Sequence, residues 1–443
     1  MPDAIHASGK GGGPTPFVNA FGRPAINSLR YNTSQAGSPV FLCYGTCRVS
    51  VNLIEDWGFK GSGGGGKGGK GLGSSAGKKG SNQSYSVNVA FGLCQGPVSF
   101  TGPTESGNLR IWANGGIAIG LGAAGLNGYG GSDGQASDPV FASADPNTPV
   151  VGYSGTAYVT GTPMQLGSSP ALPNISFEIG GIETGTAGPS YPFDARPDHI
   201  AADLLTNPRY GAGFPLAHLD SAGSLADWGN YCQAAQLAMS LLLDRQQPCA
   251  RWLEEIAQLT AAAVVWSGSL LKIIPYGDAA LSANDATWTP DLTWQYSLGD
   301  SDFLDFGGGS DPVQLTRSDP AQATNWLSAE YMDRANSYNP QIIPVFDQGL
   351  IDQYGLRSSP PIQLHEFTNP TSATVAAQLM LQRTAYVRNT YKFKLGWRYS
   401  LLEPMDIVLL TDTALGLAGA AVRITQIDED DNGELTVSAE EIP

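Results

Sequence analysis

The chain has 443 residues, a length that predicts two to four domains instead of one core. Hydrophobic residues make up 42% and charged residues only 14%, so the chain can build real cores beneath a sparsely charged surface. The formal net charge of -16 argues against broad wrapping of duplex nucleic acid, and no apolar stretch is long enough to span a bilayer.

Glycine (56) and proline (30) are abundant, which favours turns and short strands over long helices. A thin charge layer also suggests that other subunits cover much of the surface. Residues 1–37 show little periodicity and predict an extended N-terminal arm that folds only against another surface. This terminus lacks the apolar segment of a secretory signal, and the five cysteines do not form a disulfide framework. Assembly in a reducing cytoplasm is therefore expected.

Residues 38–185 predict a first β-rich domain. Alternation of polar and apolar residues marks a strand, a turn at Gly45 and a second strand within residues 39–57. A long strand follows the Gly/Lys-rich stretch and ends at Gly96 and Pro97, and an Asn-Gly turn marks a hairpin at residues 109–117. Residues 120–150 predict a long loop. Two further strands are expected at residues 156–166 and 174–182.

The Gly/Lys segment, residues 58–84, contains no acidic residue and lies between two predicted strands, so it should form the tip of a long hairpin. Gly61 to Lys67 and Gly64 to Lys70 match a phosphate-loop spacing. A glycine follows each lysine, however, and a strand follows the segment, which argues against a nucleotide site. Two interpretations stay open with equal weight: a flexible linker-like loop, or a loop that a neighbouring subunit or ring orders through its lysines. The lysines of this second interpretation are Lys60, Lys67, Lys70, Lys78 and Lys79.

Residues 186–284 predict an α/β domain. Apolar spacing, Pro197 near the start and Asn207-Pro208 at the end predict a helix over residues 196–207. Further helices are expected over residues 224–244 and 248–268, followed by a strand at 269–277. The tryptophans expected to be buried in this domain are Trp252 and Trp266.

Residues 285–443 predict a second β-rich domain that contains one helix, over residues 372–389. Four short strands follow at roughly ten-residue spacing, which is typical of a small barrel or sandwich. The turn before the last strand, Asp428 to Asp431, is acidic but lacks the spaced ligands of a calcium loop. The four short strands are expected at residues 391–399, 405–412, 420–429 and 434–441.

No pattern in the sequence assembles a catalytic, cofactor or metal site. Buried free thiols are a commoner explanation for Cys43, Cys47 and Cys94 than a metal centre, because no C-x2-C pair and no fourth ligand are evident. Cys232, Cys249 and His218 are close in sequence, yet they match no hydrolase motif. The sequence therefore predicts no catalytic residue, no cofactor and no metal ligand.

Several motifs in one order resemble the tail-tip hub proteins of long-tailed phages, such as the lambda-type tip attachment protein J and the hubs of gene transfer agents. The N-terminal motifs are Tyr44, Gly45, Arg48 and Val49, then the Gly/Lys segment, then Cys94, Gly96 and Pro97, then Ile111 and Trp112. Later stretches, among them DLLTNPRYGAG, LKIIPYGD and RNTYKFKLGWRYSLLEPMDIVLLTD, resemble the phage tail protein pattern that follows. The resemblance covers nearly the whole chain.

This resemblance implies a structural homotrimer in the virion tail tip. Two tail-tube-like β-barrel or sandwich domains flank the α/β domain in each subunit, so three subunits present a pseudo-sixfold ring to the hexameric tail tube. The implied partners are distal tail or tube ring proteins, the tape-measure protein and tip or fibre proteins. DNA would only pass through the lumen, which we expect to be acidic. Two alternatives are a tail-associated cell-wall hydrolase and a receptor-binding adhesin.

Overall fold

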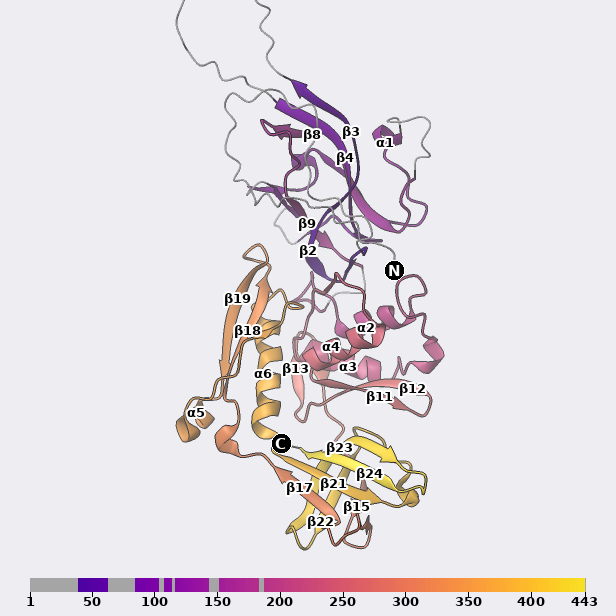
Figure 1. The fold of residues 1–443 in the computed structure, drawn as a ribbon, viewed down its shortest axis with the longest axis vertical. Coiled ribbons are helices and arrows are strands. Elements are labelled where there is room, and N and C mark those ends of the chain that lie inside the picture. The colour runs from indigo at the N-terminus through magenta and orange to yellow at the C-terminus, as the bar shows by residue number, and fades with distance from the viewer. Residues whose placement is uncertain are drawn as a thin grey trace, which may run out of the picture. The chain divides into compact units, whose positions relative to one another are not determined.

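The computed structural model describes residues 39–62, 84–102, 107–113, 116–142, 151–182 and 187–442. These residues divide into two units, one formed by residues 49–178 and the other by residues 39–48 together with the chain from residue 179 onward. Strands dominate both units and helices are concentrated in the second (Figure 1). The prediction of a mainly β, α+β fold is confirmed.

Two four-stranded sheets account for most of the chain up to residue 180. The first is antiparallel, with strand order β3 (Asn52–Ser62), β4 (Ser84–Gln95), β8 (Thr156–Gly167), β7 (Leu126–Tyr129). The second has the order β2 (Thr46–Ser50), β9 (Ile175–Gly180), β5 (Arg110–Ala113), β6 (Gly116–Ile119). The helical turns between these strands are η1 (Gly122–Ala124) and α1 (Pro139–Ala142).

Strands β3 and β4 pair on either side of residues 63–83. They are antiparallel neighbours, and the pairing reaches Ser62 opposite Ser84. Tyr85, Val87 and Val89 of β4 are buried at every second position, as expected for a strand with one face on a core. Residues 63–83 lie outside the described residues.

The stretch predicted as a long loop, residues 120–150, contains β7 and α1, so this prediction was partly wrong. Gly128 and the neighbouring polar residues hid the β7 strand from a pattern search. Asp138 holds the start of α1, because its carboxylate accepts the backbone N–H groups of Val140 (2.8 Å) and Phe141 (3.1 Å). It also accepts the hydroxyl of Thr160 at 2.6 Å.

The second unit contains the helices α2 (Pro197–Thr206), α3 (Ser224–Ala234), α4 (Cys249–Leu259), α5 (Gln348–Tyr354) and α6 (Pro370–Tyr386), and the turns η2 (Leu216–His218), η3 (Pro320–Gln322) and η4 (Trp397–Tyr399). Three strand pairs lie with them: β1 (Leu42–Cys43) with β10 (Leu242–Leu243), β11 (Ala262–Ser267) with β12 (Leu270–Pro275), and β13 (Leu281–Ala283) with β14 (Ala286–Trp288). A three-stranded sheet has the order β19 (Asn339–Phe346), β18 (Trp326–Asp333), β20 (Ile362–Gln363).

Local sequence signals explain where the long helices begin. Pro197 occupies the first turn of α2, and the helix buries Ile200 and Leu204 on one face. Asn369 caps α6 by accepting the backbone N–H of Ser372 at 2.8 Å. The helices predicted at residues 196–207 and 372–389 are therefore confirmed, with ends that differ from the predicted ones by one to three residues.

The helix predicted over residues 248–268 is shorter than expected. α4 ends at Leu259, and β11 begins at Ala262 after Ala261 adopts a left-handed conformation with φ of 49°. β11 then pairs with β12, so tertiary pairing overrides the helix propensity of the alanines. Trp266 lies on β11 and is 58% exposed, so the prediction that it is buried was wrong, whereas Trp252 is buried at 7%.

One large core joins segments that are far apart in the second unit. α2, α3 and α4 contribute Ile200, Trp228 and Ile256, and the same cluster includes Ala329 of β18 and Ala373 of α6. Figure 1 shows α6 alongside β18 and β19. The small side chains on the buried face of α6 allow the helix to lie close to the sheet.

A seven-stranded sheet forms a second core in this unit. Its order is β15 (Trp294–Leu298), β22 (Ile407–Asp412), β23 (Leu417–Glu429), β24 (Leu435–Glu441), β21 (Asn389–Leu395), β16 (Phe303–Leu304), with β17 (Val313–Arg317) also paired to β21. Only the pairing of β15 with β22 is parallel. Phe393, Val408 and Val437 are fully buried in its core. In chain order, the last four strands, β21 to β24, confirm the four strands predicted near the C-terminus.

The boundaries predicted from sequence, 1–37, 38–185, 186–284 and 285–443, stay predictions. Residues 1–37 lie outside the described residues. The large core of the second unit draws on residues from both of the last two predicted domains, for example Trp228 and Ala329.

Candidate functional site

The lysines predicted to contact a neighbouring subunit lie in or beside the Gly/Lys segment. Lys60 is exposed near the end of β3, opposite Ser86 of β4. Lys67, Lys70, Lys78 and Lys79 lie outside the described residues. Their role stays a prediction.

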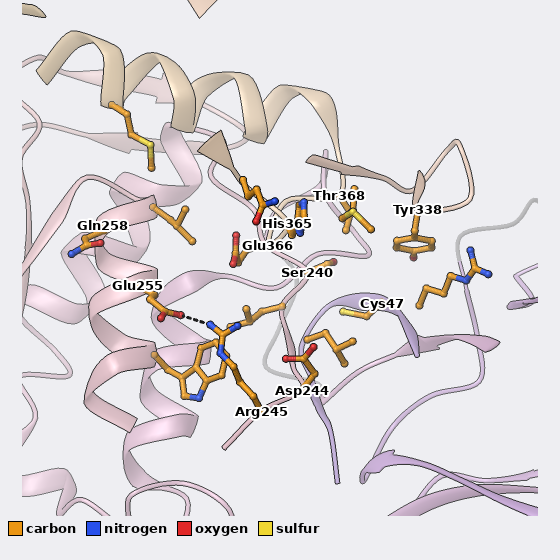
Figure 2. A pocket seen from close by; sticks show the side chains of 18 residues that line it. Cys47, Ser240, Asp244, Arg245, Glu255, Gln258, Tyr338, His365, Glu366 and Thr368 are labelled. Atoms are coloured by element: carbon orange, nitrogen blue, oxygen red, sulfur yellow. Dashed lines mark ion pairs between the residues drawn. The ribbon is translucent and has the colours of Figure 1, made fainter. Parts of the chain in front are cut away.

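A cavity of about 660 Å³ lies in the second unit (Figure 2). Its wall combines residues of β2, the segments on either side of β10, α4, the hairpin between β18 and β19, the β20–α6 connection and α6. The charged or polar side chains labelled in Figure 2 include Asp244, Arg245, Glu255, Gln258, Tyr338, His365, Glu366 and Thr368.

Arg245 contacts two other residues of the cavity wall. Its guanidinium lies 3.5 Å from the Glu255 carboxylate and 4.9 Å from the centre of the Trp252 ring. Gln247 donates a further hydrogen bond to Glu255 at 3.3 Å. These contacts keep the guanidinium of Arg245 on the cavity wall, where its positive charge partly offsets the negative charge of Glu255.

Glu366 is a half-buried acid on the cavity wall. Burial raises the pKa of its carboxyl. The backbone N–H of Glu366 itself, His365 and Arg245 each lower this pKa in part, whereas the negative charge of Glu255 raises it. The Oε2 atom of Glu366 is buried and has no hydrogen-bond partner within the described part of the chain. His365 itself is tied to Glu330 at 2.8 Å.

The cavity contains possible nucleophiles, but none is paired with a base. The Cys47 thiol donates to the Tyr44 carbonyl at 3.5 Å, and the Ser240 hydroxyl donates to Asp194 at 2.6 Å. Among the described residues, His365 is the only histidine on the wall, and it pairs with Glu330. These contacts serve structure and do not activate a nucleophile.

The three residues that carried the hydrolase alternative are engaged elsewhere. Cys232 is fully buried in the large core, and burial raises the pKa of its thiol well above the usual value. The Cys249 thiol donates to the Leu204 carbonyl at 3.2 Å, and burial raises its pKa too. His218 lies on exposed η2 and contacts the Ser269 carbonyl at 3.0 Å. A thiolate–imidazole pair does not form from them.

The side chains of Cys43, Cys47 and Cys94 are buried. Within the described ranges, no group of three or more His, Cys, Asp or Glu side chains could hold a metal ion. Helices in the same ranges also lack the combined length and apolar character that crossing a bilayer requires.

A buried polar network stands beside the cavity. Arg334 forms an ion pair with Asp194 and donates to the hydroxyls of Ser240 (2.9 Å) and Thr368 (2.6 Å). Ser240 in turn accepts the backbone N–H of Thr46 at 3.0 Å. The network therefore fastens residues 39–48 to the large core.

Gly45 fits this junction for a steric reason. Its φ is 67°, and a Cβ atom there would lie 2.5 Å from the Ser240 hydroxyl oxygen and 2.8 Å from the Met239 carbonyl oxygen. Only glycine meets both conditions without displacing the backbone. The sequence predicted a turn at Gly45, and the structure confirms one.

The second unit also exposes large apolar side chains on its three-stranded sheet and in a connection of its seven-stranded sheet. On the outer face of the β18–β19 pair, Trp326 and Phe346 stack with ring centroids 4.9 Å apart, and Ile342 is 64% exposed. On the seven-stranded sheet and its loops, Trp397 is 61% and Leu401 is 80% exposed. Large exposed apolar patches are typical of interaction surfaces. Sequence reasoning did not identify these residues, because exposure depends on which face the fold leaves uncovered.

A known protein family matches part of the chain. Residues 249–427 match the family described as “Putative phage tail protein”. This stretch contains α4, α6 and most of the seven-stranded sheet. The match is to a family of tail structural proteins, in agreement with the prediction that the chain is not an enzyme. No curated protein matches the chain.

Solved structures give further similarities. A chain from “Virion of native gene transfer agent (GTA) particle” is similar over 95% of this chain and 88% of that chain, with 16% identity and a TM-score of 0.59. This similarity shows a shared fold. The 43 kDa tail protein of prophage MuSo2 from Shewanella oneidensis gives 16% identity over 75% of this chain and 97% of that chain, with a TM-score of 0.33. A tail protein from Neisseria meningitidis MC58 gives 11% identity over 90% and 97%, with a TM-score of 0.34.

Proposed function

We propose that this protein is the structural hub of a phage or phage-like tail tip. In this proposal three copies form a pseudo-sixfold ring that joins the hexameric tail tube to tip or fibre components. The observation that carries it is the match of residues 249–427 to the tail protein family. The fold shared with a chain of the gene transfer agent virion supports it.

The two β-rich parts of the chain suit such a ring. A threefold ring can face a sixfold tube if each copy presents two similar modules. The first-unit sheets and the seven-stranded sheet are the candidates, and both carry exposed apolar side chains: Ile117 and Ile119 on β6, and Trp294 on β15. These side chains would be covered by neighbouring subunits.

The ring partners and position follow from the same proposal. The hub would meet distal tail or tube ring proteins on one side and tip or fibre proteins on the other, with the tape-measure protein and DNA passing through. The acidic composition, a net charge of -16, would keep DNA from adhering to the lumen. The protein would act in the virion tail tip after assembly in the host cytoplasm.

Native mass measurement of the purified full chain tests the oligomer directly. The proposal expects a species of three times the 46.4 kDa chain mass. Substituting Trp397 and Leu401 by Ser should shift the equilibrium toward monomer if these side chains are interfacial, whereas Leu356→Ser, a 57% exposed site in the α5–β20 connection, is the control. A chain that stays monomeric at high concentration and with its tube partner would refute the proposal.

A further inference from the structure

Strand β19 (Asn339–Phe346) lies at one edge of the three-stranded sheet (Figure 1). It pairs with β18 on one side, and among the described residues no strand pairs with its other side. Two of its side chains are large, apolar and well exposed, Ile342 at 64% and Phe346 at 49%. An exposed apolar edge of this kind is a template on which a second chain can add a strand.

Hydrogen bonds around β18 show which backbone groups of β19 face outward. The Glu330 carbonyl accepts the N–H of Leu364 at 2.7 Å, on the side of β18 that pairs with β20. Because neighbouring residues of a strand bond to opposite sides, the odd-numbered residues of β18 bond to β19. They lie opposite odd-numbered residues of β19, and the pattern continues past the strand end, where Asp347 donates to the Asn325 carbonyl at 3.0 Å. The even-numbered residues of β19 therefore direct their backbone groups outward.

Two of these outward-facing positions are prolines, Pro340 and Pro344. Proline has no backbone N–H, so on the outer edge only Ile342 and Phe346 can donate a hydrogen bond. A strand that adds to this edge would therefore lack a donor at every second outward position. The missing N–H groups cost the pairing of β18 with β19 nothing, which explains why β19 tolerates both prolines.

We propose that Pro340 and Pro344 block strand addition at this edge, so that copies of the chain do not polymerise through β19. The block allows β19 to keep exposed apolar side chains without offering a continuous row of donors to a second copy. Because the inference concerns a contact that is prevented, it does not depend on the proposed ring.

Sedimentation velocity of the full chain over a range of concentrations tests the block. The edge variant carries Pro340→Ala and Pro344→Ala. The control variant carries Pro208→Ala and Pro215→Ala, because Pro208 and Pro215 are exposed and lie outside strands and helices. Both variants remove the same number of prolines from the unfolded chain, so they differ in the edge alone.

The edge variant gains two outward N–H groups, and each hydrogen bond that they make to a second strand strengthens association by up to about tenfold. We expect the edge variant to associate at least about tenfold more strongly than the parent, whereas the control variant sediments as the parent does. Hydrogen exchange at Ile342 should slow in the associated edge variant, because its N–H then bonds to the added strand. Neither proline donates to β18, so the edge variant should keep the parent fold, and thermal unfolding checks this.

A charge at the edge provides a further variant. Ile342→Lys, added to the edge variant, places an ammonium group beside the open edge and should return association to the parent level. Equal association of the edge variant and the parent overturns the inference. Association that the control variant shares, or that Ile342→Lys does not reverse, also overturns it, since the edge of β19 is then not the surface that pairs.

Discussion

Removal of the Arg334 side chain should destabilise the second unit strongly. The side chains of Arg334 and Asp194 are 14% and 2% exposed, and they are the charged pair of the buried network. Arg334→Met leaves Asp194 buried without its cation and removes the hydrogen bonds to Ser240 and Thr368. Breaking a buried pair from one side costs about 3–5 kcal/mol, so we expect a loss of that size in the free energy of unfolding.

The assay is hydrogen exchange by mass spectrometry, read on peptides from α3 and α6, because both helices contribute to the large core. The matched control is Arg251→Met. Arg251 and its partner Glu254 are 68% and 55% exposed, so this change should cost less than about 1 kcal/mol. The double variant Arg334→Met with Asp194→Leu should regain part of the loss, since both charges are then absent. A loss below about 1 kcal/mol for Arg334→Met, or a double variant worse than the sum of the singles, would refute this reasoning.

Further predictions concern single side chains. Glu366→Gln should raise the melting temperature at pH 7 to 8. The folded-state pKa of Glu366 is raised, so its ionised form destabilises the fold above that pKa. The gain in melting temperature should vanish as the pH falls below the ordinary carboxyl pKa of 4.5. A gain that persists in acid would contradict this assignment. Gly45→Ala should lower the free energy of unfolding by at least about 1–3 kcal/mol from the left-handed backbone alone, and the clash with Ser240 adds to this loss. Denaturant unfolding measures the loss, and a neutral change would contradict the steric argument. Trp266→Ser should leave the melting temperature within about 1–2 °C because the side chain is 58% exposed, whereas a large drop would mean that its contact with Phe214 is structural.

Local patterns in the sequence determined much of the secondary structure. Alternation predicted β4, and proline with a polar stop predicted α2, because these signals act within a few residues. The end of α4 was missed since Ala262 and its neighbours suit a helix equally well. Their pairing with β12 and the left-handed Ala261 decide the outcome, and both depend on the tertiary fold.

The candidate sites were less accessible from sequence. Asp194 and Arg334 are 140 residues apart, and the cavity joins Cys47, Asp244 and Glu366 from three distant segments. No spacing rule brings such residues together.

Image averages of the full chain assembled with its tube partner test the central claim most directly. The account predicts closed rings with threefold symmetry in which each copy contributes two similar β modules, so that six modules face the tube. Rings with true sixfold symmetry and one module per copy, or particles that contain a single copy, would contradict it.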